Sequence, residues 1–243
     1  MMRLLVTRPM PDAARQAEKL KALGHEVFSA PMLEVQFLDA KLPPLAAIQA
    51  LIATSRNALR ALEAGGNMQD ALKLPLFAVG KATAGLARKL GFRKIYEGPG
   101  RAEALPLLIA AHCAPGDGAL MHLAGERLAY DVKGALEKQG FAVTRWVLYR
   151  TRAVDSFSHD AREALISGAL DGVILMSRAT AQSYVTLVGA QGLQQAAAKL
   201  AYFCLSRNVA EALAALEGAR ILIAGSPSED GLLALLHASS GHR

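Results

Sequence analysis

Several residue classes are scarce in this chain of 243 residues, and each scarcity excludes a class of protein. There are only two cysteines, Cys113 and Cys204, and no CxxC pair, so a disulfide framework is excluded. No apolar run approaches the roughly 18 residues that cross a bilayer. The apolar stretch at the N-terminus is too short for a signal-peptide core. We therefore expect a cytoplasmic protein without a membrane partner.

The common catalytic and cofactor motifs are also missing. None of the six histidines has HxH or HExxH spacing, so no metal site is expected. No GxGxxG follows the first predicted strand, where Thr7-Arg8-Pro9 stands instead, and there is no Walker A loop. There is no GxSxG elbow and no pair of carboxylates at the strand ends. We expect a site with few acids and bases and without a cofactor.

Apolar residues and positive charge are plentiful. Hydrophobic residues, mainly Ala and Leu, make up 52% of the chain, and the mean hydropathy is +0.23, which is ample for a core. The net charge is +6 and the pI is about 9.5, which favours an anionic partner. Because there is no basic block of five residues and no interleaving of basic and aromatic residues, nucleic acid is not the expected partner. A small polyanion held in a cleft fits the charge equally well.

Short apolar runs alternate with longer Ala/Leu-rich helical patterns along the whole chain. This alternation is typical of βα units around parallel sheets and predicts an α/β fold. We expect a first strand over 3–6 with a helix over 12–23 that stops at Gly24. Further strands, each followed by a helix, are expected over 50–53, 76–79, 94–96, 119–123, 172–175, 201–205 and 220–223.

An internal repeat indicates two similar domains. Ile52-Ala-Thr-Ser-Arg-Asn-Ala-Leu59 resembles Ile174-Leu-Met-Ser-Arg-Ala-Thr-Ala181, and both combine a strand, Ser-Arg and a helix. The segments starting at Phe77 and Phe203 match in the same way, and the copies lie 122 to 127 residues apart. The last unit of the first copy has its counterpart at the N-terminus, where Leu20-x-x-x-Gly24-x-x-Val27 repeats Leu136-x-x-x-Gly140-x-x-Val143.

This order predicts that one domain is discontinuous. Residues 1–35 and 154–243 would form it, and residues 36–153 would form a second domain inserted within it. The chain must then cross between domains twice, near 32–38 and 146–154. Both segments alternate apolar and polar residues, as the strands of a two-stranded linker would. The expected fold is thus two α/β domains with helix-flanked parallel sheets and a two-stranded linker.

Hydroxylic and basic residues follow the predicted strands. In open α/β sheets, ligands bind beyond the carboxyl ends of the strands, where helix N-termini favour carboxylates and phosphates. A single Ser, Thr or Asn at such a place is most often a plain N-cap, but the array as a whole favours an anion site in a crevice that the two domains share. The candidate substrate-binding residues are Thr7, Arg8, Ser55, Arg56, Lys81, Arg127, Ser177, Arg178, Ser206, Asn208 and Ser228.

With these residues in view, the sequence resembles the uroporphyrinogen-III synthase family of tetrapyrrole biosynthesis. The resemblance covers nearly the whole chain, and its pieces agree in order and spacing. They are Leu5-Val-Thr-Arg-Pro9, Thr54-Ser55-Arg56-Asn57-Ala58, Ala78-Val-Gly-Lys-Ala-Thr-Ala84, Gly125 to Gly140 leading into Val147-Leu-Tyr-Arg150, Met176-Ser-Arg178, and Ser226-Pro-Ser-Glu-Asp-Gly-Leu-Leu233.

The resemblance implies a monomeric, cofactor-free and metal-free enzyme with two α/β domains on a two-stranded linker. Its implied substrate is hydroxymethylbilane, a linear tetrapyrrole with an acetate and a propionate on each ring. The implied reaction loses the hydroxyl of ring A, forms a spiro intermediate and closes the macrocycle with ring D inverted. A two-lobed binding protein for a small polyanion, without catalysis, remains the alternative reading of the same pattern.

The resemblance also implies roles for single residues. Tyr149 stands where the family has a linker tyrosine proposed to assist hydroxyl loss, although it could equally pack between the domains. Thr83 matches the threonine of the Gly-x-x-Thr-Ala motif and is, with Tyr149, a candidate catalytic residue. Ser55 and Ser177 match the strand-end serines. The sequence departs from the pattern at Val209, where the counterpart of Thr83 lacks a hydroxyl.

Overall fold

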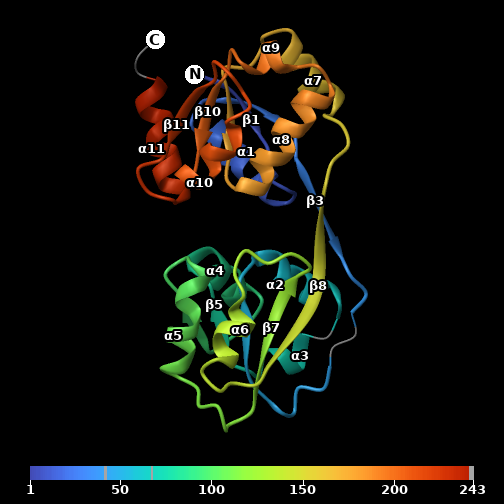
Figure 1. Ribbon diagram of the computed structural model, residues 1–243, viewed down its shortest axis with the longest axis vertical. Helices are drawn as coiled ribbons and strands as arrows, with labels where there is room; N and C mark the ends of the chain where they lie inside the picture. The colour runs from blue at the N-terminus through green and yellow to red at the C-terminus, as the bar shows by residue number, and fades with distance from the viewer. Residues whose placement is uncertain (41–42, 67, 241–243) are drawn as a thin grey trace. The chain divides into compact units, whose positions relative to one another are not determined.

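The chain forms two compact units, which are described here separately. The computed structural model describes residues 1–40, 43–66 and 68–240. Unit 1 comprises Met1–Glu34 and Arg152–Arg243, and unit 2 comprises Val35–Thr151. The chain passes from unit 1 to unit 2 within β3 (Leu33–Phe37) and returns within β8 (Val143–Ala153), and these two strands are neighbours in one sheet (Figure 1).

Unit 1 is built from both ends of the chain. Its five-stranded sheet has the order β11-β10-β9-β1-β2, and every neighbouring pair is parallel. In Figure 1 the blue N-terminal strand β1 therefore lies in the same unit as the orange and red C-terminal strands. The elements are β1 (Arg3–Val6), α1 (Asp12–Ala22), β2 (Glu26–Ser29), α7 (His159–Ile166), β9 (Gly172–Leu175), α8 (Arg178–Ala190), α9 (Gln194–Ala197), β10 (Ala201–Cys204), α10 (Arg207–Ala210), η2 (Glu211–Leu213), β11 (Arg220–Ile223) and α11 (Glu229–Ser240).

Both faces of the unit 1 sheet are covered by helices. Leu5 and Val173 face a core formed with α7, α8, α9 and α10, whereas Leu4 and Val6 face a second core formed with α1 and α11. Strands that are buried on both faces need apolar side chains at every position. This is why the central strands are short apolar runs without alternation.

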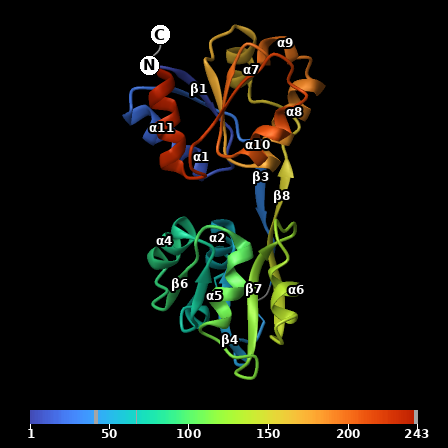
Figure 2. The ribbon, with the colours of Figure 1, turned by 60° about the vertical axis from the view of Figure 1, so that its left-hand side comes forward.

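Unit 2 has a six-stranded sheet of order β3-β8-β7-β4-β5-β6, and its strands from β8 to β6 run parallel. One face packs on α2, α3 and α4, and the other on α5 and α6 (Figure 2). Besides β3 and β8, the elements are β4 (Ile48–Ala53), α2 (Arg56–Ala64), α3 (Met68–Ala71), β5 (Leu76–Ala78), α4 (Lys81–Lys89), β6 (Ile95–Glu97), η1 (Ala102–Ala104), α5 (Leu105–Ala110), β7 (Ala119–Gly125) and α6 (Val132–Glu137).

The predicted fold class is confirmed: the protein is α/β, with two helix-flanked parallel sheets, one of them formed by strands from both termini. The structure adds to this prediction in two places. β2 was not expected as a strand, because its exposed edge position leaves little apolar signal. β8 is more than a linker, since its first part pairs with β7 over Val143–Tyr149. That pairing brings Tyr149 into the unit 2 sheet.

Candidate active site

The candidate site residues of unit 2 gather at one edge of its sheet. β4, β5 and β7 are parallel, so their carboxyl ends meet there. Ser55 and Arg56 follow β4, Lys81 opens α4 after β5, and Arg127 follows β7. Lys81 and Arg127 are exposed at this edge. The sequence prediction that these side chains come from neighbouring strand ends therefore matches the topology.

Tyr149 reaches the same edge because β8 contains a bulge. Ala124 of β7 pairs with Val147, but the next residue, Gly125, pairs with Tyr149, so Leu148 is an extra residue in β8. A bulge of this kind turns the side chains that follow it. Leu148 is buried in the core, and Tyr149 lies over the end of β7.

The ring of Tyr149 lies directly on Gly125. A Cβ atom at Gly125 would lie 2.7 Å from Cζ of Tyr149 and 2.9 Å from its hydroxyl oxygen. Such distances are shorter than any packed carbon contact, so only glycine leaves room for the phenol here. The resemblance of the sequence pointed to Tyr149, but nothing in the sequence identified Gly125 as the surface beneath it.

Ser55 is close enough to the phenol of Tyr149 to influence the pKa of that phenol through a side-chain hydrogen bond. Ser55 is also the N-cap of α2, and its hydroxyl oxygen accepts the backbone N–H of Asn57 at 3.1 Å. Burial raises the pKa of Tyr149 above its ordinary value, and the hydrogen bond from Ser55 partly opposes this rise. The phenol is consequently protonated at neutral pH and can act as a hydrogen-bond donor.

A buried histidine lies next to this pair. The Nε2 atom of His122 is 3.2 Å from the hydroxyl of Thr54, the residue before Ser55. His122 is fully buried, and its desolvation, followed by the nearby Arg145 charge, lowers its pKa to about 4. It is therefore neutral at physiological pH.

Thr83 occupies a more enclosed position than its expected catalytic role suggests. It lies in the first turn of α4, and its side chain is 4% exposed. Its counterpart in unit 1, Val209, belongs to α10, is 3% exposed and packs in the core of that unit. The position faces inward in both units, which gives the departure from the family pattern a physical reason: valine fills the same space without a hydroxyl.

In unit 1, the polar groups of two expected binding residues interact with other groups of the protein. Thr7 is fully buried, and its hydroxyl donates to the carbonyl oxygen of Ile174 at 2.7 Å, which ties β1 to β9. The guanidinium of Arg8 lies 3.0 Å from the carboxylate of Asp12, and both side chains are largely shielded from solvent. Thr7 thus has a structural partner in place of a free hydroxyl.

The other expected residues of unit 1 follow β9, β10 and β11. Ser177 caps α8 and contacts the hydroxyl of Thr180 at 2.7 Å. Arg178 donates to the side-chain oxygen of Asn208 at 3.0 Å, which joins the starts of α8 and α10. Ser206 precedes α10 without a side-chain capping bond, and Ser228 accepts the backbone N–H of Gly231. Most of these groups act as helix caps or cross-links.

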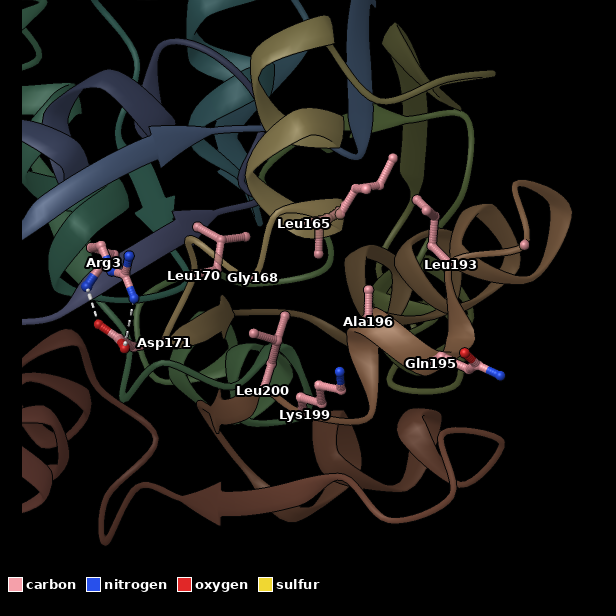
Figure 3. A pocket seen from close by; sticks show the side chains of 12 residues that line it. Arg3, Leu165, Gly168, Leu170, Asp171, Leu193, Gln195, Ala196, Lys199 and Leu200 are labelled. Carbon is pink, nitrogen blue, oxygen red and sulfur yellow. Dashed lines mark hydrogen bonds and ion pairs between the residues drawn. The ribbon is translucent and has the colours of Figure 1, made fainter.

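A cavity of about 490 Å³ lies at the opposite, amino edge of the unit 1 sheet (Figure 3). Its lining mixes leucine side chains with polar ones such as Gln195 and Lys199, and the backbone N–H of Arg3 donates to Asp171 at 2.7 Å at one end. None of the expected site residues lines this cavity. Because ligands of parallel α/β sheets bind at the carboxyl edge, the cavity does not change the location of the candidate site.

Among the described residues, no group of three or more His, Cys, Asp or Glu side chains could hold a metal ion. No helix among them is long and apolar enough to cross a membrane. Cys113 and Cys204 are both free thiols.

These features define an α/β protein with two sheets, one formed from both chain ends, and with a strand-end site of hydroxyl, phenol and basic groups. The family model described as "Uroporphyrinogen-III synthase HemD" matches residues 14–234. The chain belongs to this uroporphyrinogen-III synthase family, which is an enzyme family of tetrapyrrole biosynthesis.

Solved structures agree with the fold. Uroporphyrinogen-III synthetase from Helicobacter pylori is 16% identical with a TM-score of 0.66, and the match covers 98% of this chain and 100% of that one. A mutant uroporphyrinogen III synthase from Thermus thermophilus is also 16% identical, with a TM-score of 0.58 and coverage of 99% and 98%. No curated protein sequence matches the chain significantly.

Proposed function

We propose that this protein cyclises hydroxymethylbilane to uroporphyrinogen III with inversion of ring D. The family match over residues 14–234 carries the proposal. The net charge of +6 suits a substrate with eight carboxylates, since each of its four rings bears an acetate and a propionate.

The proposed reaction removes one water. The C–O bond of the ring A hydroxymethyl group breaks as the pyrrole nitrogen supplies electrons and loses its proton, which leaves an azafulvene. The substituted carbon of ring D attacks this azafulvene and forms a spiro intermediate. The original bond between ring D and the methylene bridge of ring C then breaks, which leaves a second azafulvene on ring C. The free α-carbon of ring D attacks it and closes the inverted macrocycle, and loss of the proton at that carbon restores the pyrrole.

Tyr149 is the proposed catalytic residue for hydroxyl loss. A hydroxide is a poor leaving group, and a hydrogen bond or proton from a phenol makes its departure easier. The phenol keeps its proton at neutral pH, because burial raises its pKa above the ordinary tyrosine value, and it is therefore available as a hydrogen-bond donor. Ser55, which lowers the pKa of this phenol, lies at the same edge of the sheet, where the helices α2 and α4 begin.

The starts of these helices are the proposed carboxylate contacts of unit 2. Each helix has nine residues and carries a partial positive charge at its N-terminus. Arg56, Lys81 and Arg127 add full charges at the same edge. Further proposed carboxylate contacts come from unit 1: Ser177, Arg178, Ser206, Asn208 and Ser228.

The main contribution of the protein is proposed to be orientation. Without a catalyst, the bilane closes to the isomer without inversion, so the enzyme must favour one ring-closing geometry over another. Orientation of reacting groups can be worth about 7–11 kcal/mol in favourable cases. This explains how a site with so few acids and bases can direct the reaction. We further propose that the enzyme is a monomer and acts in the cytoplasm. Sedimentation of the purified protein tests the monomeric state.

The decisive experiment is an isomer assay on freshly prepared hydroxymethylbilane. The product is oxidised to uroporphyrin, and the type I and type III isomers are separated by chromatography. We expect mainly type III from the native protein and only type I from a heat-denatured sample. If the native protein binds the bilane but yields type I at the spontaneous rate, the chain is a binding protein and the proposed catalysis is wrong.

A further inference from the structure

Two polar residues lie side by side in the unit 2 sheet and were not among the expected site residues. His122 of β7 and Arg145 of β8 are direct cross-strand partners in the parallel register of the unit 2 sheet. His122 is fully buried, and the Nε atom of Arg145 is also buried. A partly buried guanidinium needs hydrogen-bond acceptors, and the acceptors of Arg145 indicate its role.

The guanidinium of Arg145 binds the end of β7. Its Nη2 atom donates to the carbonyl oxygen of Gly125 at 2.7 Å and to that of Glu126 at 2.6 Å. Hydrogen bonds from a charged donor are shorter and stronger than those between neutral groups. Arg145 therefore fixes two successive peptide groups at the point where β7 leaves the sheet.

The same two residues hold Tyr149. Its ring lies on the α-carbon of Gly125, where even a methyl group would be 2.7 Å from Cζ. The backbone N–H of Glu126 donates to the carbonyl oxygen of Tyr149 at 2.9 Å. Gly125 thus sets the position of the ring, and Glu126 sets the position of the backbone that carries it.

We propose that Arg145 is a positioning residue for the phenol of Tyr149 and acts through the carbonyl groups of Gly125 and Glu126. His122 supports the other partner of the phenol, because it bonds Thr54 beside Ser55. The consequence for catalysis rests on the proposed function of Tyr149, but the effect on the position of the phenol does not. A purely structural Arg145 would lower stability without changing the environment of Tyr149.

The first test measures the Tyr149 phenol itself. The full chain is labelled with ¹³Cζ-tyrosine, and the Tyr149 signal is identified as the one that Tyr149→Phe removes. In Arg145→Met we expect this signal to move and the phenol pKa to fall by at least about half a unit, because a looser ring is better solvated. The matched control is Arg93→Met, which removes an exposed arginine of the same unit and should leave the signal unchanged.

The second test uses turnover. Arg145→Met should lower kcat by about tenfold or more, with KM within about twofold, because small displacements of a reacting group are costly. Arg145→Lys should recover much of the loss, since an ammonium can donate to the same carbonyl groups. In a Tyr149→Phe background, Arg145→Met should cause no further loss.

Each outcome decides the proposal. An unchanged Tyr149 signal in Arg145→Met, or an equal loss of kcat in the Tyr149→Phe background, overturns it. If Arg145→Met does not fold, Arg145→Gln replaces it. Gly125→Ala displaces the Tyr149 ring directly and gives the reference signal of a displaced phenol. If the native protein makes no type III isomer, the proposed function fails, but the NMR comparison still decides whether Arg145 positions the phenol.

Discussion

The phenol of Tyr149 lies beside Ser55, the residue that caps helix α2, and Ser55 lowers the pKa of that phenol. The two residues come from strands that are not neighbours, since β7 lies between β4 and β8 in the sheet. They meet because a bulge in β8 brings Tyr149 over Gly125 at the end of β7. One hydroxyl thus serves a structural cap and the proposed catalytic phenol.

Tyr149→Phe removes the phenolic proton and keeps the packing of the ring on Gly125. We expect kcat to fall by about 10²-fold or more, as for the loss of a general acid, with little change in stability. Turnover is measured by the isomer assay and stability by urea unfolding. Tyr96→Phe, which keeps the stack of that ring on Phe77, is the control and should retain full activity. Full activity in Tyr149→Phe would make Tyr149 a packing residue.

Ser55→Ala removes both the cap and the hydrogen bond to the phenol. The lost cap should lower the free energy of unfolding by about 1 kcal/mol. The pKa of Tyr149 should rise further, because the bond with Ser55 lowers it in the native protein. Turnover should fall several-fold. Ser177→Ala removes an equivalent cap from α8 and should leave the Tyr149 pKa unchanged. A Tyr149 pKa that does not respond to Ser55→Ala would contradict the bond.

Thr83→Val separates the hydroxyl of Thr83 from its volume. Because the counterpart Val209 occupies the same inward-facing position, valine should fit with a change in stability below about 1 kcal/mol. If the hydroxyl acts in catalysis, kcat falls several-fold while the melting temperature stays nearly constant. Equal kcat in both proteins would show that Thr83 serves the core alone.

Thr7→Val tests whether the hydroxyl of Thr7 binds substrate or only the protein. The bond to Ile174 is buried, so its loss should lower the free energy of unfolding by about 1–2 kcal/mol. Activity per folded molecule should be unchanged. These are measured by urea unfolding and by the isomer assay at saturating and limiting bilane. A higher KM with native stability would instead place Thr7 in the binding site.

His122 makes stability depend on pH. Its pKa is about 4 in the folded protein and about 6.5 in the unfolded chain, so between these values the unfolded state binds more protons. The free energy of unfolding should therefore fall as the pH drops from 6.5 toward 4, by up to about 3 kcal/mol. Urea unfolding between pH 7 and pH 4.5 checks this, with His122→Gln as the comparison. If the two proteins lose stability in parallel, His122 does not titrate as described.

Much of the fold could be predicted because it depends on local patterns. The strands 3–6, 172–175 and 220–223 are short apolar runs between helical patterns, and the structure places them as β1, β9 and β11. Strand β2 escaped prediction because an exposed edge strand carries too few apolar residues to stand out. The strand character of β8 was visible, but its pairing with β7 was not, because register depends on the neighbouring strand.

The candidate site divides in the same way. The residue types at the strand ends, such as Ser55, Lys81 and Arg127, follow from the order of strands and helices, which the chain itself encodes. Three features depend on exact neighbours and do not follow from that order. They are the burial of Thr7, the position of the Tyr149 ring on Gly125, and the hydrogen bonds of Arg145 to the end of β7. Hydrophobic periodicity and strand-end chemistry are properties of the sequence alone. Which hydroxyl is enclosed and which phenol is held at the edge are decided by strand register and by one bulge, since these arise only when distant segments pack together.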